Sequence, residues 1–127
     1  MGCIWITMKG WNEMAEKIKA LLFEPGKKPK DTEIENSLEA FQEAVKGYIE
    51  TLSISETVVL IANEEGLIRR MKPCVMVSIP VLHGALSCSY RYTTLVGPVV
   101  AVGVQGDEFR SLTRVERDFV LAQVRPI

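Results

Sequence analysis

The stretch KALLFEPGKKPKDTEIENSLEAFQEAVKGYIETLSI, from Lys19 to Ile54, decides the fold of this chain. It contains an apolar strand, a turn, a short return strand, a helix and a further strand. Pro25 presets the φ angle of the turn, and Gly26 allows the positive φ that a type II turn requires. The stretch therefore predicts a β-hairpin followed by a helix and another strand.

The helix of this stretch is predicted over about residues 36–46. Asn36 stands at its start with Glu39 three residues later, which is the spacing of a capping box. Gly47 follows, where a left-handed residue often ends a helix. The predicted buried face contains the apolar residues at helical spacing, Leu38, Phe41, Ala44 and Val45.

The rest of the chain is expected to extend this sheet. Apolar and β-branched runs predict strands over residues 58–62, 74–79, 89–94 and 98–104, and residues 67–71 are expected to return as a hairpin strand. Pro80 is expected to end the strand before it. Residues 81–86 are compatible with a helical turn or with a loop.

A second helix is predicted over about residues 113–124. Thr113 and Glu116 have the spacing of a full capping box. Its predicted buried face contains Val115, Phe119 and Ala122, with Val120 and Val124 as further members. The expected fold is therefore α+β, with a mainly antiparallel sheet of about five or six strands and two helices packed on it.

Residues 1–18 are predicted to form an extension of a single domain that spans residues 19–127. Trp11, Met14, Ala15 and Ile18 follow the spacing of one helical face, which is compatible with a short N-terminal helix packed on the sheet. The alternative is an extension that only a neighbouring molecule orders, and we favour a partly ordered extension.

The composition is that of a globular domain. The 127 residues are 47% hydrophobic and 24% charged, which argues against disorder. Fifteen basic and 16 acidic residues give a net charge of -1, so we expect neither a nucleic-acid-binding protein nor an acidic mimic of DNA.

The three cysteines, Cys3, Cys74 and Cys88, have no CxxC spacing and fit reduced thiols better than a disulfide framework. The N-terminus lacks the basic start and the cleavage site of a signal peptide. The apolar runs are shorter than the ~20 residues of a membrane helix. We therefore expect a cytoplasmic protein that does not associate with membranes.

Four short motifs appear together in this chain: ALLFEPGKKP at 20–29, LEAFQEAVKGYIE at 38–50, VVLIANEEG at 58–66 and VGPVVAVGV with EFRSLT at 96–113. In order and spacing they resemble a small bacterial family carried under a domain-of-unknown-function label. The resemblance implies a mobile-element setting, since members occur on phages, plasmids and conjugative elements, sometimes beside antirestriction genes. It implies no catalytic residues. Residues 71–94 depart from the family pattern, in which a polar loop follows the EEG turn.

Six basic residues are the main candidate site. They stand in two predicted turns, as Lys27, Lys28 and Lys30 and as Arg69, Arg70 and Lys72. If both turns lie at one end of the sheet, they form a patch for a phosphate group or an acidic protein. An ordinary solvated surface explains the same residues, and the pattern GxxxxGK[ST] of a phosphate-binding loop is absent.

No other group predicts a reaction. His83 is the single histidine, and its spacing from Cys74 and Cys88 matches no common zinc site. Glu64-Glu65 and Asp107-Glu108 are paired carboxylates, but solvated turns explain both pairs. We therefore expect no catalytic residue, metal or cofactor.

The aromatic residues Tyr48, Tyr90, Tyr92, Trp5 and Trp11 fit either packing in the fold or an interaction surface. The sequence thus favours a non-enzymatic accessory protein of a mobile element that acts through an unknown protein partner, with self-association into a homo-oligomer also expected. Two alternatives stay open, a phosphate- or nucleotide-binding module that uses the basic turns, and an enzyme centred on His83.

Overall fold

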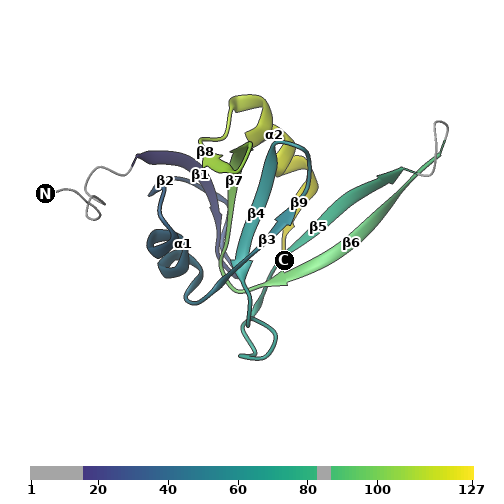
Figure 1. Cartoon of the computed structure of the whole chain (residues 1–127). Coiled ribbons are helices and arrows are strands. Elements are labelled where there is room, and N and C mark those ends of the chain that lie inside the picture. Colours follow the sequence, from purple (N-terminus) through teal and green to yellow (C-terminus); the bar gives the residue numbers. More distant parts are fainter. Residues whose placement is uncertain (1–15, 83–86) are drawn as a thin grey trace, which may run out of the picture.

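The computed structural model describes residues 16–82 and 87–127 (Figure 1), and these form two sheets and two helices. The α+β class and the mainly antiparallel sheet of six strands are confirmed. In chain order the elements are β1 (Lys17–Phe23), β2 (Lys30–Glu35), α1 (Leu38–Val45), β3 (Ile49–Ser53), β4 (Val58–Asn63), β5 (Pro73–Leu82), β6 (Cys88–Val96), β7 (Val99–Gln105), β8 (Glu108–Arg110), α2 (Arg114–Gln123) and β9 (Val124–Pro126).

The main sheet has the strand order β2-β1-β7-β4-β3, and β8 pairs with β7. Every pairing in it is antiparallel. All six residues of β4 are buried, as are the first five of β7, because these strands are covered on both faces. The predicted hairpin of β1 and β2 and the predicted central strand at residues 58–62 are therefore confirmed.

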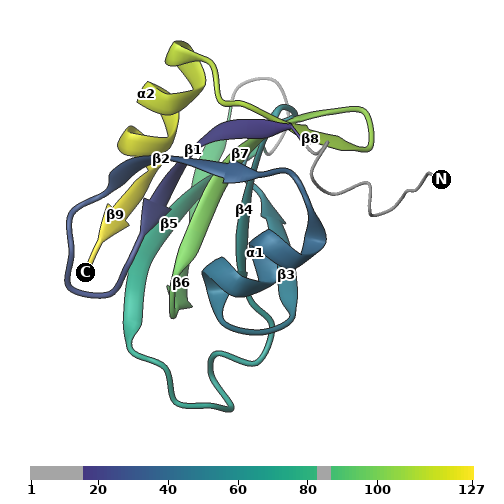
Figure 2. The ribbon, with the colours of Figure 1, turned by 90° about the vertical axis from the view of Figure 1, so that its left-hand side faces the viewer.

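Helix α1 lies on one face of the main sheet (Figures 1 and 2). Phe41 and Val45 belong to a buried cluster with Val59, Ile61 and Val100 from the central strands. Leu38 is exposed, so its predicted place on the buried face is wrong.

The ends of α1 differ from the prediction by one residue each. Ser37, not Asn36, is the N-cap, and its hydroxyl accepts from the Ala40 backbone N–H at 3.2 Å. Asn36 instead donates its side-chain amide to the Phe109 carbonyl in β8. Lys46, not Gly47, has the left-handed conformation, with a φ of 65°.

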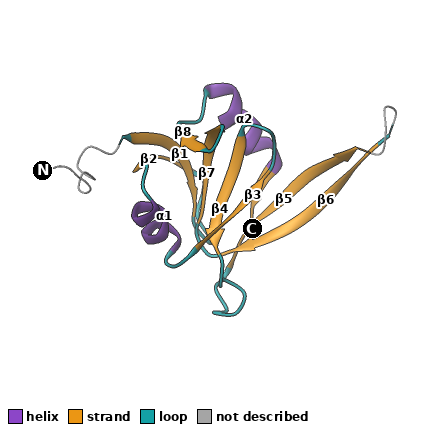
Figure 3. Ribbon diagram, in the orientation of Figure 1, coloured by secondary structure: helices purple, strands orange, loops and turns teal. Residues whose placement is uncertain are grey.

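The other face of the main sheet packs against a second sheet of order β6-β5-β9, which the sequence did not predict as a separate layer. Val75 and Val77 of β5 share a buried cluster with Leu60 of β4 and Ala101 of β7. The β5–β6 hairpin extends beyond the main sheet in Figure 3. The fold is thus a helix, a sheet, and a third layer made of the small sheet and α2.

Helix α2 has the predicted capping box, in which Thr113 and Glu116 each bond to the other's backbone N–H. Val120 is buried and joins the cluster between the sheets. Val115 and Ala122 are exposed, so their predicted burial is wrong. The helix starts at Arg114, and its first two residues face solvent, whereas the Glu116 side chain is mostly buried.

Three strand predictions need correction. Residues 67–71 form turns rather than a hairpin strand, and Arg70 there has a positive φ of 55°. Strand β5 continues through Pro80, because β9 pairs only with Val75–Val77 and one backbone edge of β5 is free of a strand partner beyond them. The segment Val124–Pro126 forms a strand, β9, that the sequence did not predict, and α2 ends before it at Gln123.

The predicted N-terminal helix falls mainly outside the described residues. Trp11, Met14 and Ala15 lie in the part that the structure does not describe. Ile18 is buried in β1, so its assignment to a helical face is wrong.

Candidate functional site

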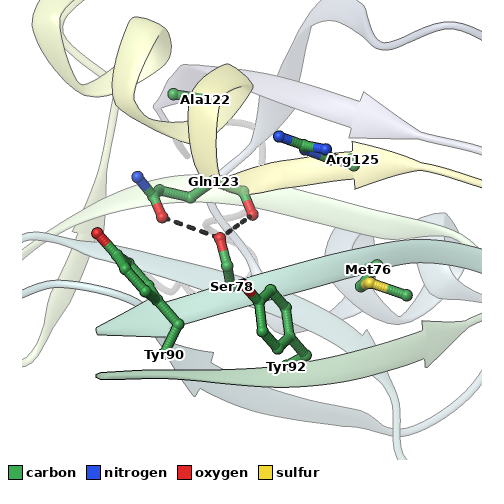
Figure 4. A pocket seen from close by; sticks show the side chains of 7 residues that line it. All are labelled: Met76, Ser78, Tyr90, Tyr92, Ala122, Gln123 and Arg125. Carbon is green, nitrogen blue, oxygen red and sulfur yellow. Dashed lines mark hydrogen bonds between the residues drawn. The ribbon is translucent and has the colours of Figure 1, made fainter. Parts of the chain in front are cut away.

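The outer face of the second sheet carries a groove of about 270 Å³. Figure 4 shows its lining, which combines aromatic, thioether and polar side chains with one cation: Met76, Ser78, Tyr90, Tyr92, Ala122, Gln123 and Arg125. Strands β5 and β6 form the floor, and the junction of α2 with β9 forms one wall. The groove is therefore formed by segments that lie far apart in the sequence, the β5–β6 pair and the α2–β9 junction.

The strand register explains why these side chains meet. Ser78 lies opposite Tyr92, and Met76 lies between Arg125 of β9 and Thr94 of β6. Because side chains alternate across a strand, Met76 and Ser78 face outward while Val75 and Val77 are buried. Alternation on a three-stranded sheet thus assembles the groove.

The tyrosines of this face are exposed. Tyr92 is 68% accessible, Tyr90 55% and Met76 43%. Of the predicted alternatives for these aromatic residues, burial in the core is therefore wrong for Tyr90 and Tyr92, which lie on a face of the second sheet. Tyr48 is also exposed but precedes β3 in the main sheet, whereas Trp5 and Trp11 lie outside the described residues.

Ser78 ties the floor of the groove to its wall. Its hydroxyl is 3.3 Å from the Gln123 backbone carbonyl and 3.1 Å from the Gln123 side-chain oxygen (Figure 4). The Gln123 carbonyl belongs to the last turn of α2, where carbonyls lack partners within the helix. These contacts fasten β5 to the C-terminal end of α2 along one side of the groove.

Arg125 is the one charged side chain that lines the groove. It is exposed and forms no ion pair with any residue among 16–82 and 87–127. By contrast, Arg110 pairs with Glu116 at 2.8 Å and Arg117 with Asp31 at 2.7 Å. The groove therefore offers an unpaired cation on β9 and aromatic rings on β6, with β5 between them.

The predicted basic patch is divided between two loops at one end of the main sheet. Strands β1 and β4 both run antiparallel to β7, so the loops that follow them lie at the same end, the lower one in Figure 2. All six residues are exposed: Lys27, Lys28, Lys30, Arg69, Arg70 and Lys72.

Two of the six already have partners. Arg69 donates to the Lys46 carbonyl at 2.6 Å and so caps the C-terminal end of α1. Lys27 lies 3.8 Å from the Glu24 carboxylate, which is a weak surface pair. Within the described chain, no contact connects the cations of one loop to those of the other. The only support for a shared site is that both loops lie at the same end of the main sheet.

The other predicted candidates are not brought together. His83 lies outside the described residues, and Cys88 lies in β6. Cys74 is buried, and this burial, with a smaller effect of Glu24, raises the pKa of its thiol to about 11. Such a thiol stays protonated at neutral pH and behaves as a small apolar group.

The paired carboxylates remain in solvated turns. Glu64 and Glu65 follow β4, and Asp107 and Glu108 lie at the start of β8, all of them exposed. Among residues 16–82 and 87–127, no cluster of three or more histidine, cysteine or acidic side chains could hold a metal ion.

Glu116, the carboxyl group with the largest pKa shift in the described chain, belongs to an ion pair that connects two elements of the fold. Arg110 donates two hydrogen bonds to Glu116, and with the Thr113 backbone it lowers the Glu116 pKa to about 2. This pair connects β8 to the start of α2. It lies apart from the groove.

Sequence reasoning found Tyr90 and Tyr92 but missed the rest of the groove. Period-two alternation along residues 74–79 would have placed Met76 and Ser78 on one face. Gln123 and Arg125 could not be found this way, because Gln123 is the last residue of α2 and Arg125 lies in β9, whose pairing with β5 is set by tertiary contacts.

Comparison with known proteins identifies the family of the chain. Residues 18–124 match the family model described as a domain of unknown function, DUF3846. Comparisons with curated proteins and with solved structures give no match. Within the described residues, neither helix is long and apolar enough to cross a membrane. The family match runs from β1 to β9 and includes both sheets and both helices, so the chain belongs to the DUF3846 family.

Proposed function

We propose that this chain is a non-enzymatic accessory protein of mobile genetic elements that binds another protein through the outer face of the second sheet. The observation that carries the proposal is the groove, which exposed Tyr90, Tyr92 and Met76 line together with Arg125, a cation without an ion pair in the described part of the chain. The mobile-element setting is supported by the resemblance of the EPGKKP, NEEG and SLT motifs.

The chemistry of the groove fits a protein partner. Tyrosine, methionine and arginine are enriched where proteins meet, and tyrosine and arginine dominate binding energy there. A partner that places an apolar side chain against Tyr92 and a carboxylate at Arg125 would match both the rings and the charge. The proposed occupant is therefore a protein segment with an apolar residue beside an acidic one.

A component of host defence is the proposed class of partner. This step rests on the occurrence of similar genes beside antirestriction genes. The face itself selects for an acidic and apolar segment, which many host proteins can present.

The test compares capture from host cells by the full chain and by two matched variants. Arg125→Glu reverses the charge in the groove, and Arg114→Glu makes the same change at the exposed start of α2. We expect a host protein that the wild-type chain and Arg114→Glu retain and Arg125→Glu loses. Titration of that purified protein should show at least tenfold weaker binding to Arg125→Glu. Equal binding to all three chains would overturn the proposal.

A second candidate function is the binding of a phosphate or nucleotide by the two basic loops. It is favoured by their position at the same end of the main sheet. A thermal-shift titration with inorganic phosphate and ATP tests it. Binding predicts stabilisation that Lys28→Glu abolishes and that Lys17→Glu, at the other end of β1, leaves unchanged. No stabilisation at millimolar ligand excludes this candidate.

A further inference from the structure

Within the described chain, strand β6 has a long edge without a strand partner. The strand is nine residues long, and its segment Tyr90–Thr94 pairs with β5 on one side alone. An exposed strand edge presents unpaired backbone N–H and C=O groups that can pair with another strand.

The other edges are protected in ways that β6 is not. Four of the six residues of β2 are charged, which opposes pairing with another strand. Strand β9 has three residues and ends at Pro126, and β3 has five. In β6 the sequence CSYRYTTLV has one charge, Arg91, and no proline or glycine. Its aromatic and β-branched residues favour strand pairing.

We propose that a second copy of this chain pairs antiparallel with β6 and joins the two three-stranded sheets into one. In one continuous sheet, the two-fold axis that relates two antiparallel copies of a strand is normal to the sheet, so each residue points to the same face in both copies. Residues that lie opposite each other in an antiparallel pair also point to the same face. Both statements hold only if one residue of β6 lies opposite the same residue of the second copy.

Tyr92 is the residue at the centre of this register. It is the midpoint of the segment Tyr90–Thr94, and centring there places Tyr90 opposite Thr94 and Arg91 opposite Thr93 of the second copy. The pairs contain no like charges, and the aromatic rings meet across the axis.

The neighbouring registers are less favourable. Centring on Arg91 would place two guanidinium groups opposite each other, which destabilises a strand pair. Centring on Thr93 would bring Tyr90 against Val96 of the second copy. Val96 lies against Gly66, where even an added Cβ would collide with it, so this end of β6 is covered.

The dimer would place Tyr90 and Tyr92 of both copies on one continuous outer face. It would thus carry two grooves side by side and double the docking face. Self-pairing does not depend on the proposed protein partner, because it is measured with this chain alone.

The test is a charge exchange at the axis, read by sedimentation and light scattering of the full chain. We expect the wild type to dimerise, and Tyr92→Asp and Tyr92→Lys each to weaken dimerisation at least tenfold through like charges. An equimolar mixture of the two variants should restore the dimer, because Asp then faces Lys. Tyr48→Asp changes a tyrosine of similar exposure just before β3, away from β6, and should dimerise as the wild type does.

Circular dichroism of each variant verifies that it is folded. A wild-type chain that stays monomeric at several hundred micromolar would overturn the proposal. So would dimers of both single variants, or a mixture that stays monomeric.

Discussion

Asn63 is a polar side chain that is almost completely buried at the end of β4. Its amide donates to the Val45 carbonyl at 2.9 Å, and its oxygen accepts from the Glu65 N–H at 2.7 Å. The first bond satisfies a carbonyl in the last turn of α1, and the second shapes the turn after β4. One side chain thus fastens the helix to the central sheet.

Replacing Asn63 should destabilise the fold through the bond to α1. Asn63→Ala leaves the Val45 carbonyl without its donor, and the expected loss is about 2 kcal/mol of unfolding free energy. Asn63→Asp keeps an acceptor for Glu65 but places a negative charge at the negative end of the helix, so we expect it to lose more. Urea unfolding measures both changes. An Asp variant as stable as the wild type would show that the bond to Val45 is dispensable.

At the end of α1, Lys46 has a backbone conformation that favours glycine, whereas Gly47 has no room for a larger side chain. Lys46 has the left-handed conformation that glycine adopts without steric cost, so Lys46→Gly should raise the unfolding free energy by about 1 kcal/mol. A Cβ at Gly47 would lie 2.7 Å from Asn63 Nδ2, so Gly47→Ala should destabilise the protein. Thermal unfolding of the two variants compares the effects, and shifts in the same direction would contradict this account.

At the scale of elements, the sequence predicts the start of a helix correctly where the capping contacts are made between neighbouring residues. The capping box of Thr113 and Glu116 lies within four residues of sequence and predicted α2 correctly. At α1 the spacing of Asn36 and Glu39 indicated the wrong cap, because Asn36 bonds to Phe109, 73 residues away. Ser37 is also a good cap residue, so local chemistry alone could not choose between them.

The Arg110–Glu116 pair makes the attachment of α2 dependent on pH. The Glu116 pKa is about 2 in the folded chain against 4.5 ordinarily, so the unfolded chain binds more protons between these values. Stability from this group is therefore complete above about pH 4.5 and is lost as the pH falls toward 2. Glu116→Gln should flatten this part of the stability profile and lower stability at pH 7 by about 2 kcal/mol.

Urea unfolding at pH 7, 4 and 3 measures the effect. Glutamine can still accept from the Thr113 N–H, so the substitution isolates the charge. Asp31→Asn is the control, since the Asp31 pKa is also lowered by Arg117 but the pair is exposed, and we expect a smaller change. An unchanged profile in Glu116→Gln would show that the Arg110 pair does not stabilise the fold.

At the scale of the whole molecule, the order of the strands and their division into two sheets could not be predicted from the sequence. The apolar runs at residues 58–62 and 98–104 predicted buried strands correctly, because burial on both faces leaves a continuous pattern. Assigning β5, β6 and β9 to a separate layer requires knowing that Val75 pairs with Pro126. That contact joins segments 51 residues apart, and no periodicity within either segment encodes it.

The two sheets should differ in amide hydrogen exchange. Strands β4 and β7 have strand partners on both sides and are buried, so their amides should exchange slowest, near the rate of global unfolding. In a monomer, the outward amides of Tyr90–Thr94 in β6 have no strand partner and should exchange much faster. Pairing between two copies would slow those amides as protein concentration rises, while β4 and β7 stay unchanged. Exchange in β6 that is equally fast at low and high concentration would contradict the dimer, and fast exchange in β4 would contradict the strand order itself.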